Sequence, residues 1–240
     1  MKNVEGQRIP DVTFRTRDDA KWKNVSTTEV FSGKRVIVFA LPGAFTPTCS
    51  SAHLPRYKEL MPQFQAKGVD SIVCLSVNDA FVMDEWSSRQ GADGITFLPD
   101  GNGEFTEKLG MLVDKSNLGF GKRSWRYSML VNDGVIEKMF IEPDKEGDPF
   151  EVSDADTMLK FLDPTAKPPR DVLLFTKPGC SFCVKAKQLL GAKGWAYEEV
   201  PSSPRSLRAV SGKASTPQVF VDGKHIGGAD ELERYLATAS

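Results

Sequence analysis

Two cysteine motifs in the sequence have the residue types that thiol redox chemistry needs. Cys49 stands in the segment PGAFTPTCS, directly after an apolar run at residues 36–41. Cys180 and Cys183 form a C-x-x-C pair after a second apolar run at residues 172–176. A cysteine that follows a buried strand and opens a helix meets unpaired N–H groups and the positive end of the helix dipole, which favour the thiolate. Both motifs therefore indicate nucleophilic sulfur chemistry.

The residues around Cys49 suit a thiol that reacts with a small ligand. Pro42 and Pro47 restrict the approach loop, and Thr46 supplies a hydroxyl that can bond to the sulfur or to a bound oxygen. His53 follows Cys49 by one helical turn, so it either shapes the same pocket or packs in the core through a hydrogen bond. The alternative for Cys49 is a buried structural cysteine at a helix start.

Polar and turn-forming residues accompany the second motif. Lys177 adds positive charge beside Cys180. Thr216-Pro217 precedes a predicted strand, and we expect a cis bond there that exposes backbone groups to an extended thiol peptide. Gly228 and Asp230 open the last predicted helix, whose N-terminus can receive a carboxylate.

Composition narrows the classes of function. The chain has 31 basic and 32 acidic residues, so it lacks the electrostatic footprint of a nucleic-acid-binding protein. Its four cysteines are too few for a disulfide-stapled secreted scaffold. The N-terminal residues have no apolar signal-peptide core, and the longest apolar run is far short of the roughly 18 residues that cross a bilayer. We expect a cytoplasmic protein with no membrane or nucleic-acid partner.

A zinc site is the competing interpretation of the C-x-x-C pair. Structural zinc needs four clustered ligands, but a second C-x-x-C pair is missing. The two histidines, His53 and His225, are far apart in the sequence. We therefore predict no metal site.

Strand and helix patterns alternate along the first two thirds of the chain. Buried strands are predicted at residues 36–41, 72–77 and 95–98, and a hairpin turns at 132–134. A helix begins at Cys49, where Pro55 and Pro62 predict a kink and an early end. Ser153 and Asp156 have the spacing of a capping box for a helix that stops at Asp163-Pro164.

The segment DPTAKPPR at residues 163–170 contains three prolines and no apolar periodicity, so it is predicted to be an extended linker. It separates a domain at residues 1–162 from one at residues 171–240. The second domain again alternates strand and helix. Both halves are therefore predicted to be α/β sheets layered with helices.

The first motif resembles a known family. Pro42, Thr46 and Cys49 match the P-x-x-x-T-x-x-C signature of peroxiredoxins, and PGAFTPTCS is similar to their type-5 branch. The resemblance covers residues 1–162 and implies that Cys49 is the peroxidatic cysteine. It also implies that Arg126, in SWRYSMLV, is the arginine that holds peroxide and thiolate, with Thr46 helping to orient the peroxide.

The sulfenic acid formed at Cys49 must meet a thiol before more peroxide oxidises it irreversibly. Cys74 lies inside an apolar strand pattern and is interpreted as a buried hydrophobic residue. Some type-5 peroxiredoxins carry a resolving cysteine late in the domain, whereas residues 75–179 contain none here. This departure indicates an external thiol.

The segments CSFC, TP and GGAD resemble the glutathione site of glutaredoxins, over residues 171–240. The common C-P-Y-C is C-S-F-C in this chain. The resemblance implies two thioredoxin-like domains, as in bacterial hybrid peroxiredoxin–glutaredoxin fusions. It implies glutathione-binding residues at Lys177, Cys180, Thr216, Pro217, Gly228, Ala229 and Asp230.

Together the two resemblances imply a glutathione-dependent peroxidase that reduces hydrogen peroxide and small organic hydroperoxides. Glutathione is the reducing co-substrate, no tightly bound cofactor is needed, and a homo-oligomer, dimer or tetramer, is expected. Cys180 takes glutathione from Cys49, and Cys183 is a second thiol that can pair with Cys180. Two alternatives are a peroxide-sensing thiol–disulfide oxidoreductase and a module that binds an iron–sulfur cluster at Cys180.

Overall fold

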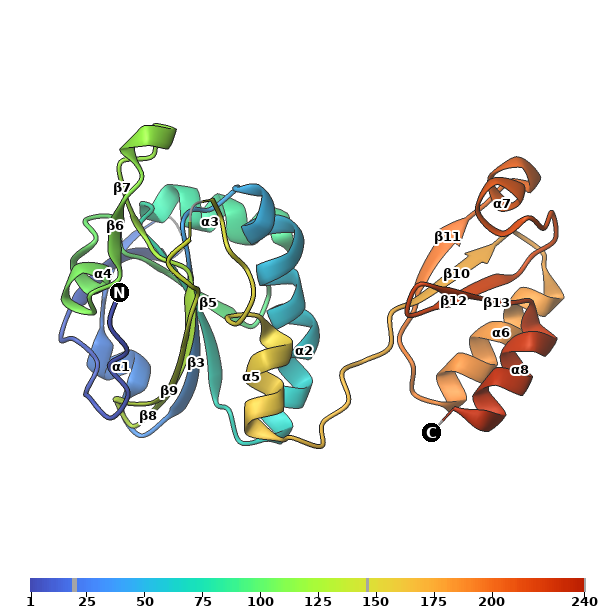
Figure 1. The fold of residues 1–240 in the computed structure, drawn as a ribbon, viewed down its shortest axis with the longest axis horizontal. Coiled ribbons are helices and arrows are strands. Elements are labelled where there is room, and N and C mark those ends of the chain that lie inside the picture. Colours follow the sequence, from blue (N-terminus) through green and yellow to red (C-terminus); the bar gives the residue numbers. More distant parts are fainter. Residues whose placement is uncertain (19–20, 146, 240) are drawn as a thin grey trace. The chain divides into compact units, whose positions relative to one another are not determined.

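The chain forms two compact units, Met1–Ala166 and Lys167–Ser240 (Figure 1). The structure, a computed structural model, describes residues 1–18, 21–145 and 147–239. The predicted linker at residues 163–170 includes the division between the units. The side chains at its two ends are tied down locally, because Lys67 pairs with Asp163 and Arg170 pairs with Asp222.

The first unit is built on a five-stranded mixed sheet with the order β5-β4-β3-β8-β9. β3 lies at its centre, parallel to β4 and antiparallel to β8. The strands are β3 (Arg35–Leu41), β4 (Ser71–Ser76), β5 (Ile95–Pro99), β8 (Tyr127–Asn132) and β9 (Val135–Ile141). β8 and β9 form the predicted hairpin, with Asp133 and Gly134 both at positive φ in the turn.

Side chains of β3 alternate between two apolar cores, one on each face of the sheet. Ile37, Phe39 and Leu41 face a core that also holds Cys49 and residues of three helices. These helices are α2 (Leu54–Ala66), α3 (Ala80–Gln90) and α5 (Ala155–Leu162). The opposite core contains residues of the hairpin β1 (Thr13–Asp18) and β2 (Lys21–Ser26) and of α1 (Thr27–Phe31) and α4 (Glu104–Lys108).

Four short elements complete the first unit. The residues from Cys49 to His53 form a π-helical turn, η1, that leads directly into α2. A small antiparallel ribbon of β6 (Leu112–Asp114) and β7 (Lys122–Ser124) encloses the 3-10 turn η2 (Ser116–Leu118).

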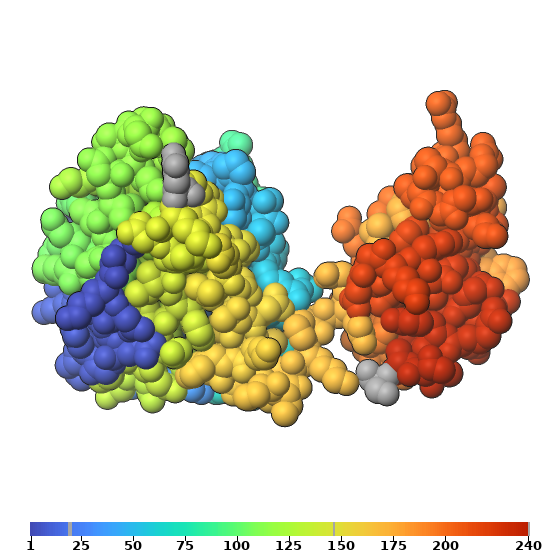
Figure 2. Space-filling model, in the orientation of Figure 1, coloured from blue at the N-terminus to red at the C-terminus, as the bar shows by residue number. Residues whose placement is uncertain are grey.

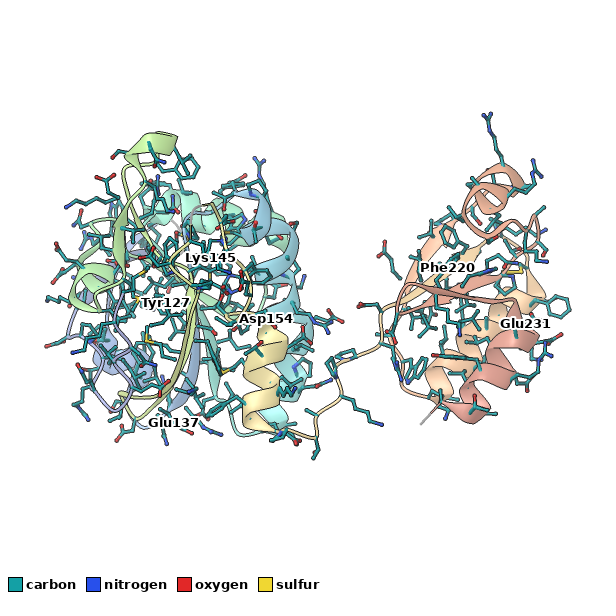
Figure 3. The ribbon with its side chains drawn as sticks, viewed as in Figure 1. Tyr127, Glu137, Lys145, Asp154, Phe220 and Glu231 are labelled. Atoms are coloured by element: carbon teal, nitrogen blue, oxygen red, sulfur yellow. A yellow bond between two sulfur atoms is a disulfide. The ribbon has the colours of Figure 1, made fainter. Side chains whose placement is uncertain are left out.

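Two local predictions are corrected by the structure. α2 does not end at Pro62 but continues to Ala66, because Leu60 and Phe64 on either side of the proline are fully buried against the sheet. The N-cap of α5 is Asp154, which accepts a hydrogen bond from the Thr157 N–H, rather than Ser153. Figure 3 labels Asp154 at the start of this helix.

The second unit has a four-stranded sheet with the order β11-β10-β12-β13. Figure 1 shows α6 and α8 side by side on one face and α7 on the other. The elements are β10 (Val172–Thr176), α6 (Ser181–Ala192), β11 (Glu198–Pro201), α7 (Pro204–Ser211), β12 (Gln218–Val221), β13 (Lys224–Gly227) and α8 (Ala229–Thr238). The predicted α/β class of both halves is confirmed.

Candidate active sites

Cys49 is the first residue of η1, just beyond the end of the central strand β3. Its thiol is free and its exposed fraction is 0%. The turn is wider than an α-helical turn, because the Leu54 N–H donates to the Cys49 carbonyl five residues earlier. π-turns of this kind occur frequently at functional sites.

The loop between β3 and η1 holds Thr46 in a fixed orientation. The Thr46 hydroxyl donates to the Gly43 carbonyl at 2.8 Å, and the Ala44 N–H donates to Asn78 Oδ1 at 3.0 Å. Since its proton is used inside the loop, the Thr46 oxygen is left as a hydrogen-bond acceptor for a ligand.

Arg126 is the cation that the sequence alone could not pair with Cys49 by spacing. It is 1% exposed, and its Nη1 lies 3.5 Å from Cys49 Sγ. Its Nη2 donates to Asp148, while its Nε–H, which is buried, has no hydrogen-bond partner among the described residues. Burial opposes the charge, but the sulfur of Cys49 and the carboxylate of Asp148 outweigh it, and the pKa of Arg126 lies above its ordinary value.

His53 contacts the same guanidinium from η1. Its Nδ1 lies 3.1 Å from Arg126 Nη1, and its Nε2 lies 3.2 Å from the Ser153 carbonyl. Because arginine only donates and a carbonyl only accepts, the ring must be neutral with its proton on Nε2. Burial, followed by the charge of Arg126, lowers the pKa of His53 to about 3, in agreement with a neutral ring.

A pocket of about 270 Å³ opens beside this cluster. Three of the predicted site residues, Pro42, Thr46 and Arg126, line it. Its other lining residues are mostly apolar and include Pro47, Leu118, Phe120, Trp125, Asp148 and Pro149. Figure 2 shows the segment after β9 (yellow) at the surface beside the segment that leads into α2 (blue).

Cys74 is not part of this constellation. It lies in β4, is 0% exposed, and packs in the same apolar core as Cys49. Burial, with a smaller contribution from Cys49, raises the pKa of the Cys74 thiol well above its ordinary value. The thiol therefore stays protonated and is a poor nucleophile.

Cys180 is the N-cap residue of α6, and the structure joins it to Cys183 in a disulfide. The Cys183 N–H points at Cys180 Sγ at 3.1 Å, as expected of a sulfur at a helix N-terminus. Cys183 is 3% exposed, whereas Cys180 is partly exposed. Cys180 is thus the sulfur of this pair that a partner reaches first.

The predicted glutathione-binding residues approach Cys180 from two sides. Thr216 Oγ1 lies 3.4 Å from Cys180 Sγ, and the Thr216-Pro217 bond is cis, as expected. Lys177 instead lines a hollow of about 440 Å³ whose walls come from β10, β11 and α6.

The N-terminus of α8 belongs to the same side of the site as Thr216. Gly228 is its N-cap residue, and the Gly228 N–H already donates to the Glu231 carboxylate at 3.0 Å. The next residues, Ala229 and Asp230, begin the helix, and the Asp230 carboxylate pairs with Lys185 at 2.9 Å. The N–H groups of the first turn are therefore the groups left for a ligand carboxylate.

Sequence reasoning missed the loop after β9. Asp148, Phe150 and Ser153 all contact Arg126 or His53, although they lie about a hundred residues beyond Cys49. No spacing rule joins segments so far apart. The one local signal is Glu142, a carboxylate next to an apolar strand, which is 1% exposed in the fold.

Comparisons with known proteins match the two parts of the chain to two different families. The Redoxin family model matches residues 4–159 and the Glutaredoxin model residues 172–226. The chain is 61% identical to Hybrid peroxiredoxin hyPrx5 from Haemophilus influenzae over 241 residues, covering 99% of this chain and 100% of the relative. The chain is a peroxiredoxin with a fused glutaredoxin domain. The resemblance seen in the sequence is therefore confirmed.

Other relatives match the peroxiredoxin domain alone. Peroxiredoxin sll1621 from Synechocystis is 62% identical over 169 residues, covering 65% of this chain and 89% of the relative. A crystal structure of reduced Prx3 from Vibrio vulnificus in complex with H2O2 matches with a TM-score of 0.63 and 44% identity, covering 68% of this chain and all of that one. Both domains have the predicted thioredoxin-like fold.

Over residues 1–18, 21–145 and 147–239, no group of three or more His, Cys, Asp or Glu side chains is arranged to hold a metal ion. Within the same part of the chain, every helix is too short or too polar to cross a membrane.

Proposed function

We propose that this peroxiredoxin is a glutathione-dependent thiol peroxidase, in which Cys49 reduces hydroperoxides and Cys180 passes on electrons from glutathione. One observation carries the proposal. The buried sulfur of Cys49 lies 3.5 Å from a buried guanidinium, beside a small pocket that Pro42, Thr46 and Arg126 line. A cation in an enclosed, mostly apolar site stabilises both the thiolate and the charge that develops on oxygen.

In the first step the Cys49 thiolate attacks one peroxide oxygen, and the O–O bond breaks. The sulfur is oxidised to a sulfenic acid, and the second oxygen leaves as hydroxide or alkoxide and takes up a proton. Arg126 donates to the reacting oxygens, for which its Nε–H, without a partner among the described residues, is a free donor. The Thr46 hydroxyl oxygen accepts a hydrogen bond from the peroxide O–H, without a proton transfer. The pocket volume of about 270 Å³ suits hydrogen peroxide and small organic hydroperoxides.

In the second step glutathione attacks the sulfenic sulfur, so that a mixed disulfide forms and water leaves. An external thiol is needed because Cys74 is buried in a strand and stays protonated. In this proposal the external thiol is glutathione. Since Cys49 is 0% exposed, the η1 turn has to open before a tripeptide thiol can reach the sulfur.

In the third step the Cys180 thiolate attacks the glutathione sulfur of the mixed disulfide. Cys49 leaves as a thiolate and glutathione becomes bound to Cys180. A second glutathione then attacks the sulfur of the glutathione bound to Cys180, which releases oxidised glutathione and restores the Cys180 thiolate. Alternatively Cys183 displaces the glutathione and closes the disulfide with Cys180, which two further glutathione molecules reduce.

Bound glutathione would lie along the side of Thr216 and α8. The backbone beside Pro217 can pair with the extended peptide, and the first N–H groups of α8, at Ala229 and Asp230, can bind its γ-glutamyl carboxylate. Gly228 joins this helix start to the Pro217 side of the site, and Lys177 supplies a positive charge from the other side of Cys180.

Assembly and location belong to the same proposal. Leu118 and Phe120, at the pocket rim, are 56% and 41% exposed, and a second copy of the chain would cover such apolar surface. We expect a homo-oligomer, dimer or tetramer, in the cytoplasm. Measuring the molar mass in solution by light scattering tests the assembly.

The test follows NADPH consumption with hydrogen peroxide, glutathione and glutathione reductase. Cys49→Ser and Cys180→Ser should both abolish turnover, and Cys74→Ala, which removes an unused thiol, should keep it. If Cys180→Ser retains full turnover, the second domain is not the electron donor and peroxide sensing becomes the better interpretation. If the unmodified protein consumes no NADPH, the assignment of glutathione is wrong.

A further inference from the structure

A buried carboxylate organises the loop that faces the Cys49 site. Glu142 follows β9 directly and is 1% exposed. Its Oε1 accepts hydrogen bonds from the N–H groups of Val152 and Ser153 and from the Ser153 hydroxyl, at 2.7 to 2.9 Å. Its Oε2 accepts from the Glu151 N–H at 2.8 Å. Four donors on one buried carboxylate fix the backbone of residues 151–153.

Glu142 remains charged in this position. Burial by itself would raise the pKa of its carboxyl group. The three N–H groups and the hydroxyl of Ser153 more than offset burial, so the pKa of Glu142 lies below its ordinary value. The arrangement is therefore an anion held in a ring of donors rather than a neutral acid.

The far side of the same loop faces His53. With its N–H and hydroxyl both bound to Glu142, Ser153 has its carbonyl left to accept from His53 Nε2 at 3.2 Å and from the Tyr57 hydroxyl at 3.0 Å. This carbonyl forces the His53 proton onto Nε2. The ring is also held between Phe39 and Phe150, whose centroids are each 5.0 Å away.

The consequence appears at the opposite ring nitrogen. Because Nε2 carries the proton, Nδ1 must accept, and it accepts from Arg126 Nη1 at 3.1 Å. The same Nη1 lies 3.5 Å from Cys49 Sγ. A chain of contacts therefore runs from Glu142 through Ser153, His53 and Arg126 to the reactive sulfur.

We infer that Glu142 and His53 are positioning residues for peroxide reduction, because they fix the direction in which the Arg126 guanidinium points at Cys49. The inference rests on the proposed role of Cys49. Neither residue needs to touch the peroxide. Misplacing a reacting group by about 1 Å can cost about 100-fold in rate, so the orientation of a single guanidinium is worth fixing.

Other groups that act on the same cluster must be held constant in a test. Asp148 pairs with Arg126 from the loop, Tyr57 shares the Ser153 carbonyl from α2, and Cys74 faces the same core from β4. Glu142 itself approaches from the end of β9. None of these is altered in the variants below except Glu142.

The first test compares Glu142→Gln with Glu137→Gln. Each variant loses one carboxylate charge, from β9 or from the residue that follows it. Glu137, however, lies at the surface, paired with Arg35 at 3.1 Å. Stopped-flow measurement of Cys49 oxidation by hydrogen peroxide, without glutathione, should give a rate constant about 10- to 100-fold lower for Glu142→Gln and unchanged for Glu137→Gln.

A double-mutant comparison separates positioning from simple loss of fold. Because Glu142 acts through Arg126, Glu142→Gln should lower the rate constant far less in an Arg126→Met background than in the unmodified protein, with an unchanged circular dichroism spectrum. An equal loss in both backgrounds, or an unchanged rate constant in a folded Glu142→Gln variant, would overturn the inference.

The second test uses His53, in case Glu142→Gln does not fold. The amide oxygen of Asn can take the place of Nδ1 and accept from Arg126, whereas the longer Gln reaches toward Ser153 and offers nothing at Nδ1. We expect His53→Asn to react with peroxide about tenfold faster than His53→Gln. Equal rate constants for the two variants would contradict the inference.

These outcomes are distinct from failure of the proposed function. If Cys49 of the unmodified protein does not react with peroxide at all, the peroxidase proposal fails before any variant is measured. If it reacts and the variants match it, only the positioning role of Glu142 and His53 is lost.

Discussion

The two thiol sites occupy equivalent places in their domains but are enclosed very differently. Cys49 follows the central strand β3 and starts η1, and Cys180 follows β10 and caps α6. Cys49 is 0% exposed and lies against a buried arginine. Cys180 is partly exposed, bonded to Cys183, and flanked by Phe182, which is 57% exposed.

In the proposed cycle, this difference matches the size of the molecule that each sulfur reacts with. A hydroperoxide is small and gains from a closed, cationic site in which charge on oxygen is stabilised. A thiol-disulfide exchange partner is bulky and needs open access to the sulfur. On this proposal, the same strand-to-helix junction serves two reactions, and the segments that pack over it decide which one.

The largest effect should come from removing the cation that distinguishes the two sites. Arg126→Met should lower the rate constant of Cys49 oxidation by peroxide about 100- to 1000-fold, because a preorganised donor is lost. The rate constant of Arg126→Lys should lie between those of Arg126→Met and the unmodified protein, since lysine keeps the charge but not the forked geometry. The exposed Arg89, which lies over Phe45 beside the same loop, is the matched control as Arg89→Met. Stopped-flow oxidation measures all three, and a normal rate for Arg126→Met would contradict the assignment.

The enclosure of the first site should also appear as a dependence of stability on pH. The pKa of His53 is lowered from 6.5 to about 3, so below pH 6.5 the unfolded chain binds a proton that the folded one does not. The contribution of neutral His53 to the free energy of unfolding is therefore fully present above pH 6.5. It is lost as the pH falls toward 3, by several kcal/mol in the limit. His53→Asn should lose less over this window than the unmodified protein.

Unfolding of the first domain can be followed separately. Trp195 is the only tryptophan of residues 167–240, so Trp195→Phe restricts tryptophan fluorescence to the first domain. Urea unfolding at several pH values in this background gives the two stability profiles. If the profiles with and without the His53→Asn substitution run parallel, the pKa of His53 is not lowered by folding, and this prediction is wrong.

A smaller effect is expected at the second site. Cys183→Ser should keep most of the glutathione-dependent turnover, because exchange through glutathionylated Cys180 does not need a second protein thiol. Mass spectrometry of the working enzyme should then find glutathione on Cys180 of this variant. A loss of turnover as complete as that of Cys180→Ser would establish the dithiol route instead.

The smallest effect concerns the N-terminus of α8. Asp230→Asn should raise KM for glutathione by a few fold, because its carboxylate suits the ammonium of the γ-glutamyl group. The exposed pair with Lys185 should add nothing measurable to thermal stability. Glu233→Gln is the control, since Glu233 pairs with the same lysine at 2.7 Å but lies a turn farther along the helix. Equal KM values for both variants would remove Asp230 from the glutathione site.

The sequence by itself determined the class of fold and the places of Cys49 and Cys180, each between a strand and a helix. Strand periodicity followed by a helix start identifies the settings of Cys49 and Cys180, because these signals are local and depend on a few consecutive residues. The β8–β9 hairpin followed from Asn132, Asp133 and Gly134 for the same reason.

Only the tertiary structure decided what surrounds each sulfur. The contacts from Arg126 and His53 to Asp148 and Ser153 depend on how β8 pairs with β3 and on how the loop after β9 folds back over η1. Glu142 fixes that loop through four donors that become its partners only in the folded chain. Burial then sets the charge state of His53, because desolvation is a property of the packed environment and not of the neighbouring residues in the chain.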